Sequence, residues 1–135
     1  MCARGCGGAL AMKTIVIDNL EWQAKDDGNR RSLRDSIIYA ATLGDGWRLP
    51  TIEELISIID FTTHGPACKI KSCRSSYYWS NGPYANNSST AWGVNFLNGY
   101  VYGNYKGFYY YARCVREFRA IQQQKGVVGN EDNNY

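Results

Sequence analysis

The sequence predicts an α+β fold, with two helices followed by an antiparallel sheet meander. The first observation is a change of hydrophobic period: apolar residues recur at helical spacing between residues 33 and 59 and alternate at strand spacing from Tyr77 onward. The second is an Asn-Gly pair between two alternating segments, which is the strongest short-range signal of a β-hairpin. With 135 residues, the chain has the usual length of one domain with one hydrophobic core.

Short strands are expected on both sides of the helices. KTIVID at residues 13–18 is rich in β-branched side chains, and LEWQ at residues 20–23 continues it or pairs with it across Asp18-Asn19. After the helices, alternating segments separated by turns predict the meander. Its strands are expected at Tyr77–Trp79, Ala91–Phe96, Tyr100–Tyr105 and Tyr109–Arg116, with turns at Leu97–Gly99 and Lys106-Gly107.

The two helices are indicated by capping residues and by their apolar spacing. Ser32 begins the first helix, and Gly44 is its expected C-cap. Thr51 begins the second helix with Glu54 in capping-box position, and this helix is expected to stop near Phe61. The predicted apolar faces are Leu33, Ile37, Ala40 and Ala41 on the first helix, and Ile52, Leu55, Ile56 and Ile59 on the second.

Composition argues against catalysis and against nucleic-acid binding. The net charge of +3 gives no sign of the strongly basic face that nucleic acid requires. No Asp or Glu occurs between Ser75 and Arg116, so this part offers neither paired carboxylates nor hard metal ligands. His64 is the only histidine, and nucleophilic triads need such a base. The chain is therefore not expected to be an enzyme or to need a cofactor. Direct insertion into a membrane is not expected either, because no apolar run is long enough to span one.

The five cysteines are an odd number, so at least one is free or pairs between chains. His64, Cys68 and Cys73 are spaced H-x3-C-x4-C, but zinc would need a fourth ligand, and no metal is expected. A Cys68–Cys73 disulfide and two reduced surface thiols remain alternatives. Cys114 is expected to be a small buried apolar residue. The core is also expected to hold the four tryptophans, Trp22, Trp47, Trp79 and Trp92.

The two ends of the chain differ in composition from its centre. Residues 1–12, which include Cys2 and Cys6, are predicted to be a disordered leader or a cloning remnant. Residues 13–117 are the predicted domain, and the polar stretch 118–135 is predicted to be a flexible tail. Because no stretch resembles a secretory signal, the chain is expected either to stay inside the cell or to leave it within a larger particle.

Tyrosine is concentrated in the meander: nine of the eleven lie in the range Tyr77–Tyr111, among Asn, Ser and Gly. Alternation places Tyr100, Tyr102 and Asn104 on the face opposite Val101. Tyrosine offers a large contact area with few rotatable bonds, and Asn, Ser and Gly add adaptable hydrogen bonding, as in antibody combining sites. Tyr77, Tyr78 or Tyr110 must fill the core, yet one small sheet cannot bury nine tyrosines on one face. The segment therefore predicts a recognition surface.

Four blocks of sequence carry a resemblance to a known family. They are GWRLPTIEELISIID (Gly46–Asp60), SSYYWSNGPYANNSSTAWGVNF (Ser75–Phe96), NGYVYGNYKG (Asn98–Gly107) and ARCVR (Ala112–Arg116). Together they resemble the C-terminal domain of collagen-like bacterial adhesins over roughly residues 13–117. The resemblance implies a C-type-lectin-like fold of the formylglycine-generating-enzyme type. A subset of the family comprises variable proteins of diversity-generating retroelements, like the tropism determinant at the tip of a bacteriophage tail fibre.

In that subset, adenine-directed mutagenesis of Asn codons changes surface residues of the last strands and loops. In this chain, every residue from Leu97 to Tyr111 except Lys106 is one that such mutagenesis of an Asn codon can produce. The resemblance thus implies a protein or glycan receptor as partner and a place on a virion or cell surface, within a larger viral or surface assembly. The fixed scaffold would include Trp79, Trp92, Val94, Phe96, Val101 and Cys114. The implied ligand contacts are Asn81, Gly82, Thr90, Gly93, Leu97, Tyr100, Tyr102, Gly103, Asn104, Tyr105, Gly107, Phe108 and Tyr109.

Two other functions remain open at this stage. A fixed-specificity adhesin would bind polysaccharide or glycosaminoglycan through Lys69, Lys71, Arg74 and Lys106, with an affinity that falls steeply as salt is added. An enzyme of the sulfatase-modifying type would use Cys68 or Cys73, but its reactive cysteine pair and metal ligands have no recognisable counterpart here. The calcium–sugar motifs of true lectins are not found either, so a lectin-like fold does not imply sugar binding.

Overall fold

The computed structural model describes residues 12–83 and 89–118. Most of the predicted leader, with Cys2 and Cys6, and most of the predicted tail lie outside these described residues. Within them, neither helix has the length and hydropathy that crossing a bilayer would require.

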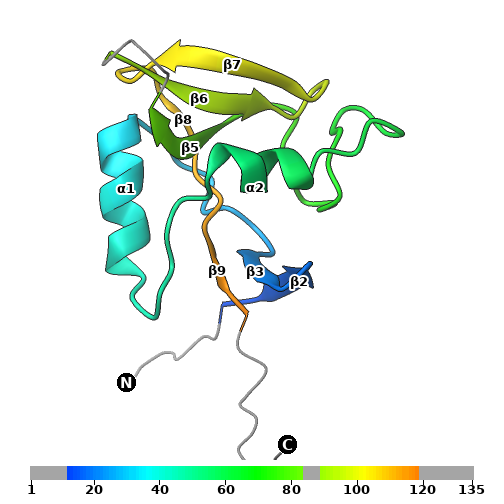
Figure 1. Cartoon of the computed structure of the whole chain (residues 1–135), viewed down its shortest axis with the longest axis horizontal. Coiled ribbons are helices and arrows are strands. Elements are labelled where there is room, and N and C mark those ends of the chain that lie inside the picture. The colour runs from blue at the N-terminus through cyan, green and yellow to red at the C-terminus, as the bar shows by residue number, and fades with distance from the viewer. Residues whose placement is uncertain (1–11, 84–88, 119–135) are drawn as a thin grey trace, which may run out of the picture.

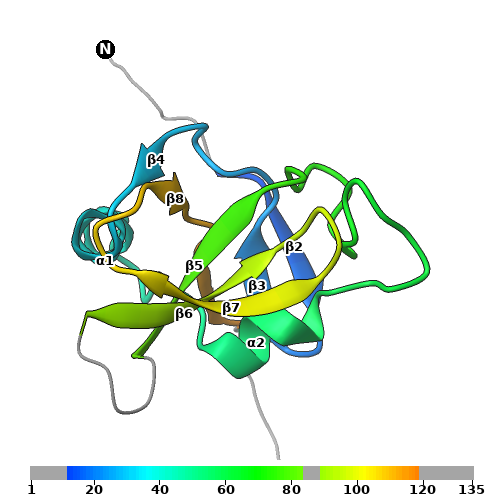
Figure 2. The same ribbon diagram turned by 90° about the horizontal axis from the view of Figure 1, so that it is seen from above.

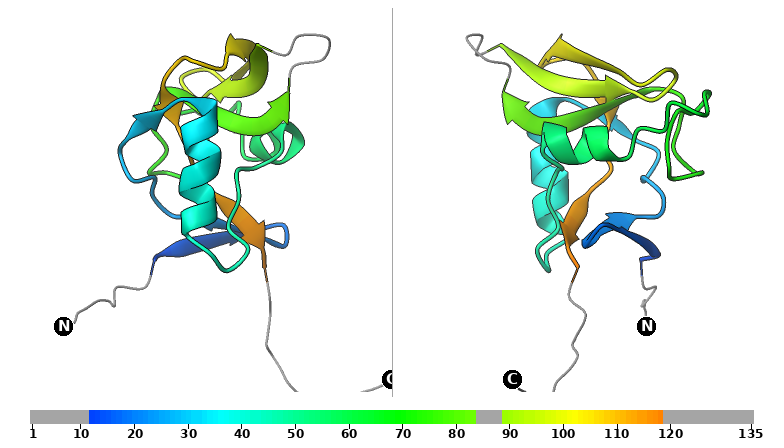
Figure 3. Two further views of the ribbon diagram at one scale, coloured as in Figure 1. Left: turned by 90° about the vertical axis from the view of Figure 1, so that its left-hand side faces the viewer. Right: turned by 45° about the vertical axis from the view of Figure 1, so that its right-hand side comes forward.

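In residues 12–83 and 89–118, two sheets and two helices make up the fold, and the predicted α+β class is confirmed (Figure 1). The helices are α1 (Leu33–Thr42) and α2 (Ile52–Ser57). A small sheet has the order β2 (Thr14–Ile17), β3 (Leu20–Gln23) and β9 (Val115–Glu117). The larger sheet has the order β4 (Arg30–Arg31), β8 (Tyr110–Tyr111), β5 (Tyr77–Pro83), β6 (Thr90–Asn95) and β7 (Tyr100–Tyr105). The small sheet lies at the end of the molecule where the described chain begins and ends, and β7 lies at the opposite end (Figures 1 and 3).

Local turn chemistry explains the two tight hairpins. Strands β2 and β3 pair antiparallel across Asp18 and Asn19, whose φ angles of 51° and 67° are in the left-handed region that Asp and Asn tolerate best after glycine. Strands β6 and β7 pair across the turn that ends at Gly99, where φ is 84°. The predicted pairing of residues 13–18 with 20–23 is confirmed, as is the hairpin at the Asn-Gly pair.

Both predicted helix starts are confirmed. The Ser32 hydroxyl accepts a hydrogen bond from the Asp35 backbone N–H, and Thr51 and Glu54 satisfy one another's backbone donors in a complete capping box. The Glu54 carboxylate also accepts two hydrogen bonds from Arg48, at 2.7 and 2.9 Å, and this lowers the pKa of Glu54. The expected end near Phe61 was wrong, because α2 already stops at Ser57.

The buried faces of the helices differ from the predicted ones. On α1, Leu33, Ser36 and Ala40 are buried, whereas Ile37 is 47% exposed. On α2, Leu55 is buried but Ile56 is 42% exposed. On such short helices, the apolar spacing is compatible with more than one buried face. The sheet against which a helix packs decides which face is buried.

The core has two parts, one on each side of the larger sheet. The part under α2 reaches the small sheet and is built from Trp22, Leu55, Ile58, Ile59, Cys68, Ile70, Cys73, Tyr78, Val94, Phe96 and Val115. The part under α1 is built from Leu33, Ala40, Trp47, Leu49, Trp79, Ala91, Ala112 and Cys114. Of the predicted scaffold residues, Trp79, Val94, Phe96 and Cys114 are buried, while Trp92 and Val101 are half-buried.

The last predicted strand, Tyr109–Arg116, is in fact two strands in different sheets. Strand β8 pairs antiparallel with β4 and parallel with β5, whereas β9 pairs with β3. Between them, Ala112, Arg113 and Cys114 are buried and run from one sheet to the other. The chain therefore uses this buried stretch to join its two sheets, a change of partner that an alternating pattern alone does not reveal.

Candidate functional site

A row of aromatic rings crosses the larger sheet at the end of the molecule that carries β7. Neighbouring ring centroids are separated by 5.5 Å (Tyr105–Phe108), 6.1 Å (Phe108–Tyr110), 4.8 Å (Tyr110–Tyr77), 5.8 Å (Tyr77–Tyr102) and 6.0 Å (Tyr102–Tyr100). We call these six residues the aromatic ribbon. They come from β5, β7, β8 and the connection from β7 to β8, which are seen together from above in Figure 2.

Strand register brings the ribbon together. Across β5, β6 and β7, Trp79 lies opposite Gly93 and Gly93 lies opposite Tyr102. Because Gly93 has no side chain, the Tyr102 ring can reach over β6 and contact the Tyr77 ring of β5. The glycine is therefore part of the scaffold on which the ribbon lies.

Gly93 itself is buried, which corrects its assignment as a ligand contact. A Cβ atom at this position would lie 2.9 Å from the Tyr78 carbonyl oxygen and 3.3 Å from the Asn104 Nδ2 atom. The first of these atoms belongs to the backbone of a central strand and has little room to move. The absence of a side chain at Gly93 therefore allows β5 and Asn104 to lie close to β6. Gly93 is not part of the candidate site.

Replacing Gly93 by alanine is expected to lower the free energy of unfolding by about 1–3 kcal/mol, because the new methyl group overpacks the sheet. Gly82→Ala is the matched control on the neighbouring strand, since its Cβ would meet its nearest atoms at 3.6 and 3.8 Å, which is ordinary contact. Urea denaturation monitored by tryptophan fluorescence measures both changes. Equal stability of the two variants would contradict the scaffold role of Gly93.

The other predicted contacts differ in their exposure. Eight are exposed: Asn81, Leu97, Tyr100, Gly103, Tyr105, Gly107, Phe108 and Tyr109. Four are half-buried: Gly82, Thr90, Tyr102 and Asn104. The structure gathers Tyr100, Tyr102, Tyr105 and Phe108 in the ribbon, and Asn104 joins them because its Oδ1 atom accepts a hydrogen bond from the Tyr110 hydroxyl at 3.2 Å. Asn81 is separate and lies beside α1, in a hollow that Ile37 and Trp47 also line.

Sequence reasoning missed the two half-buried rings at the centre of the ribbon. Tyr77 and Tyr110 were among the rings expected to fill the core, but they stack on one another at 4.8 Å and connect the exposed rings on either side. Tyr110 also packs on the buried Trp79 at 4.8 Å, and Trp79 donates a hydrogen bond from Nε1 to the Arg31 carbonyl. These contacts seat the ribbon on the core, so its exposed rings have a fixed base.

The ribbon is uncharged and contains hydrogen-bonding groups. Tyr100, Tyr105 and Phe108 are 57%, 55% and 52% exposed, respectively, so the ribbon presents aromatic faces and phenol groups to solvent. Desolvation raises the pKa of Tyr110, and desolvation together with the neighbouring phenols raises the pKa of Tyr102. Both phenols therefore stay neutral at ordinary pH and can donate as well as accept hydrogen bonds.

Cys68, Cys73 and Cys114 are not part of the aromatic ribbon. All three are free and buried, so both alternatives for Cys68 and Cys73, a disulfide and a pair of surface thiols, were wrong. A hydrogen bond between these two thiols lowers the pKa of Cys68 and raises that of Cys73, and burial raises the pKa of Cys114 to about 12. His64 is exposed in the preceding loop, and no set of three or more potential metal ligands is brought together in the described parts of the chain.

Comparison with protein-family models identifies the family of the chain. A family model described as the Lcl C-terminal domain matches residues 15–116. The chain belongs to this family. The match begins within β2 and ends within β9, so the Lcl C-terminal domain includes both sheets, both helices and the whole aromatic ribbon. This confirms the family resemblance inferred from the W-R-L-P-T block and identifies a domain of the binding or adhesin type. A search of curated protein sequences found no match.

Proposed function

We propose that this Lcl C-terminal domain is a C-type-lectin-like, receptor-binding module without catalytic activity, and that it binds a protein or glycan through the aromatic ribbon. The single observation that carries the proposal is the ribbon itself. Three of its six rings are more than half exposed, and all six are in ring-to-ring contact across the larger sheet. Tyrosine-rich surfaces of this kind give large contact areas at a low cost in conformational entropy.

The ribbon also suits a segment whose residues are diversified by retroelement mutagenesis. Tyr100, Tyr102, Tyr105 and Phe108 all lie in the range Leu97–Tyr111, which mutagenesis of Asn codons can reach except at Lys106. Their side chains are exposed or half-buried, so substitutions there would alter the surface with little effect on the core. The base of the ribbon is the buried Trp79, and mutagenesis of an Asn codon cannot produce tryptophan. The variable surface would therefore rest on a constant residue.

The position of the ribbon supports display on a larger viral or cell-surface assembly. The described chain starts at Met12 and ends at Phe118, and both points lie by the small sheet, at the end of the molecule away from β7 (Figures 1 and 3). A domain attached through that end would present the ribbon outward. An attachment there would leave β5, β6 and β7 free to contact a receptor.

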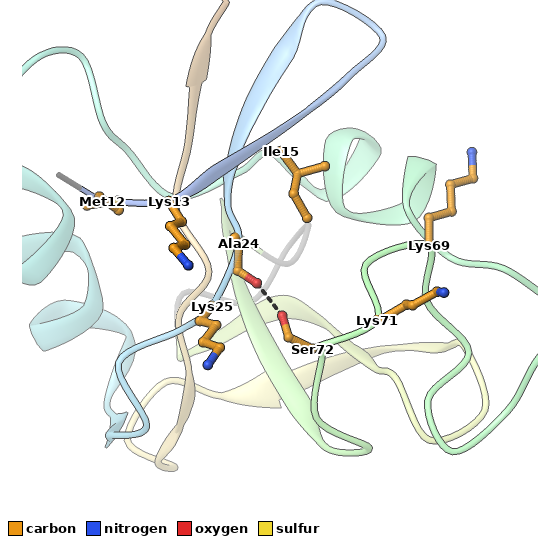
Figure 4. A pocket seen from close by; sticks show the side chains of 8 residues that line it. All are labelled: Met12, Lys13, Ile15, Ala24, Lys25, Lys69, Lys71 and Ser72. Carbon is orange, nitrogen blue, oxygen red and sulfur yellow. Dashed lines mark hydrogen bonds between the residues drawn. The ribbon is translucent and has the colours of Figure 1, made fainter.

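A second candidate function, adhesion to an anionic polysaccharide, is favoured by a hollow at the small sheet (Figure 4). It has a volume of about 600 Å³, and no acidic residue lines it. Its lining consists of four lysines and four other residues: Lys13, Lys25, Lys69, Lys71, Met12, Ile15, Ala24 and Ser72. The four cations predicted for this function are not together, however. Arg74 pairs with Asp26, and Lys106 lies beside α1.

One binding experiment separates the two functions. The fluorescently labelled chain is applied to arrays of glycans, sulfated polysaccharides and cell-surface proteins, as wild type, as Tyr100→Ser/Tyr102→Ser and as Lys69→Gln/Lys71→Gln. If the ribbon binds the receptor, the tyrosine variant should lose at least about tenfold in affinity, because exposed aromatic anchors dominate such interfaces, while the lysine variant should bind like wild type. Loss in the lysine variant alone, with binding that falls steeply as salt is added, would instead establish the adhesin function.

A further inference from the structure

Helix α1 carries an apolar stripe that faces outward. Arg34, Ile37, Ile38 and Ala41 are three or four residues apart, so they share one side of the helix, and all four are exposed. Ile37 is 47% exposed and Ile38 is 50% exposed. Sequence spacing had placed Ile37 and Ala41 on the buried face, so this stripe is visible only in the folded protein.

The stripe borders two hollows. The larger one has a volume of about 540 Å³ and lies between the first turns of α1 and the connection from β7 to β8. Its lining residues are Ser32, Leu33, Arg34, Ile37, Ile38, Lys106 and Gly107, and we call it the α1 groove. A hydrogen bond of 3.1 Å from the Leu33 N–H to the Lys106 carbonyl joins its two walls. Ile37 also lines the second hollow, of about 380 Å³, which includes Asn81.

The α1 groove is continuous with the aromatic ribbon. Lys106 and Gly107 line the groove, and they lie in the chain directly between the ribbon residues Tyr105 and Phe108. Seen from above, the connection from β7 to β8 passes beside α1 (Figure 2). A receptor that covers this end of the ribbon would therefore also reach Ile37 and Ile38.

The charges at the groove indicate what it would accept. Arg34 and Lys106 line it, no carboxylate does, and neither cation forms a salt bridge with any residue in the described parts of the chain. The walls thus combine three aliphatic side chains with two unpaired positive charges. An aliphatic or aromatic side chain would fill the apolar part, and carboxylates on either side of it would pair with the cations.

We propose that the α1 groove binds an acidic, apolar peptide segment of the receptor, so that the receptor contacted by this domain is a protein. The inference rests on the proposed function, because it treats the groove as an extension of the ribbon surface. A saccharide would leave the two isoleucines without an apolar partner. A peptide would cover them and satisfy the cations in the same contact, which is how interfaces combine an apolar centre with a charged rim.

A random peptide library displayed on phage and selected on the immobilised full chain tests the proposal. The enriched peptides should carry Asp or Glu next to Leu, Ile or Phe. Their affinity should fall at least about tenfold for Ile38→Ser. It should be unchanged for Ile56→Ser, a matched control with an isoleucine of similar exposure on α2. Raising the salt concentration should weaken the binding of the enriched peptides to the wild-type chain.

Several outcomes would overturn the proposal. They are the absence of any enriched peptide, enrichment of basic or uncharged peptides, and equal binding to Ile38→Ser and wild type. A dimer detected by analytical ultracentrifugation that Ile38→Ser dissociates would assign the groove to a second copy of the chain. Peptides that bind the Tyr100→Ser/Tyr102→Ser chain normally but not Ile38→Ser would support the groove while contradicting the ribbon, and the reverse pattern would retain the ribbon alone.

Discussion

Replacing Asp26 by alanine is expected to lower the free energy of unfolding by about 3–5 kcal/mol, the range seen when one partner of a buried ion pair is removed. The Asp26 side chain is 3% exposed, and the Arg113 side chain is 1% exposed. Arg113 Nη2 lies 3.7 Å from Asp26 Oδ2. Without the carboxylate, the guanidinium would remain charged in the core with no counter-ion, because arginine does not lose its proton in proteins.

The surroundings of Arg113 offer little compensation for that loss. Its Nη1 atom donates a hydrogen bond to the Gln23 carbonyl at 2.6 Å, but its Nε and Nη2 atoms have no hydrogen-bond partner among the residues that the structure describes. Asp26 also accepts hydrogen bonds from the Tyr78 hydroxyl and from Arg74 Nε. One substitution would therefore loosen three segments that meet here: the loop after β3, strand β5 and the segment that joins the two sheets.

Asp27→Ala is the matched control, because Asp27 is the next residue and makes a more exposed ion pair with Arg31 at 2.6 Å. Its removal should cost no more than about 1 kcal/mol. Equilibrium unfolding in urea measures both variants. If Asp26→Ala were no less stable than Asp27→Ala, the pair between Asp26 and Arg113 would contribute nothing beyond an ordinary surface contact.

Trp79→Ala is expected to destabilise the domain by about 3–5 kcal/mol, because it removes a large and fully buried ring and leaves a cavity. It also removes the hydrogen bond from Nε1 to the Arg31 carbonyl, which measures 2.8 Å. Since Tyr110 packs on Trp79, the centre of the aromatic ribbon would lose its base. Receptor binding should therefore weaken together with stability, although Trp79 is itself inaccessible.

Tyr100→Ala provides the comparison, since the Tyr100 ring is 57% exposed at the end of the ribbon. Its effect on the free energy of unfolding should be within about 0.5 kcal/mol, as for most surface substitutions. Thermal and urea denaturation give the stability, and the array experiment gives the binding. A Trp79→Ala chain with unchanged receptor affinity would show that the ribbon does not depend on this support.

The candidate site was predictable in part. Composition alone located it, because the tyrosines concentrate in one stretch that lacks carboxylates. It could not show which rings would gather, since that depends on the register that sets Gly93 opposite both Trp79 and Tyr102. For the same reason the family resemblance placed Gly93 among the contacts, and Tyr77 and Tyr110 were among the rings expected to fill the core. Spacing along one strand carries no information about the residues that face it from the next.

The sequence by itself determined the features that depend on a few neighbouring residues. Each of these features needs only local backbone geometry and a suitable side chain. They are the Thr51–Glu54 capping box, the left-handed turn at Asp18-Asn19 and the hairpin turn that ends at Gly99. Only the tertiary structure decided which stripe of α1 turned outward, where the last strand changed sheets, and how Asp26 came to meet Arg113. The physical reason is that these outcomes depend on contacts between segments far apart in the chain, whose energies become available only when the whole core packs at once.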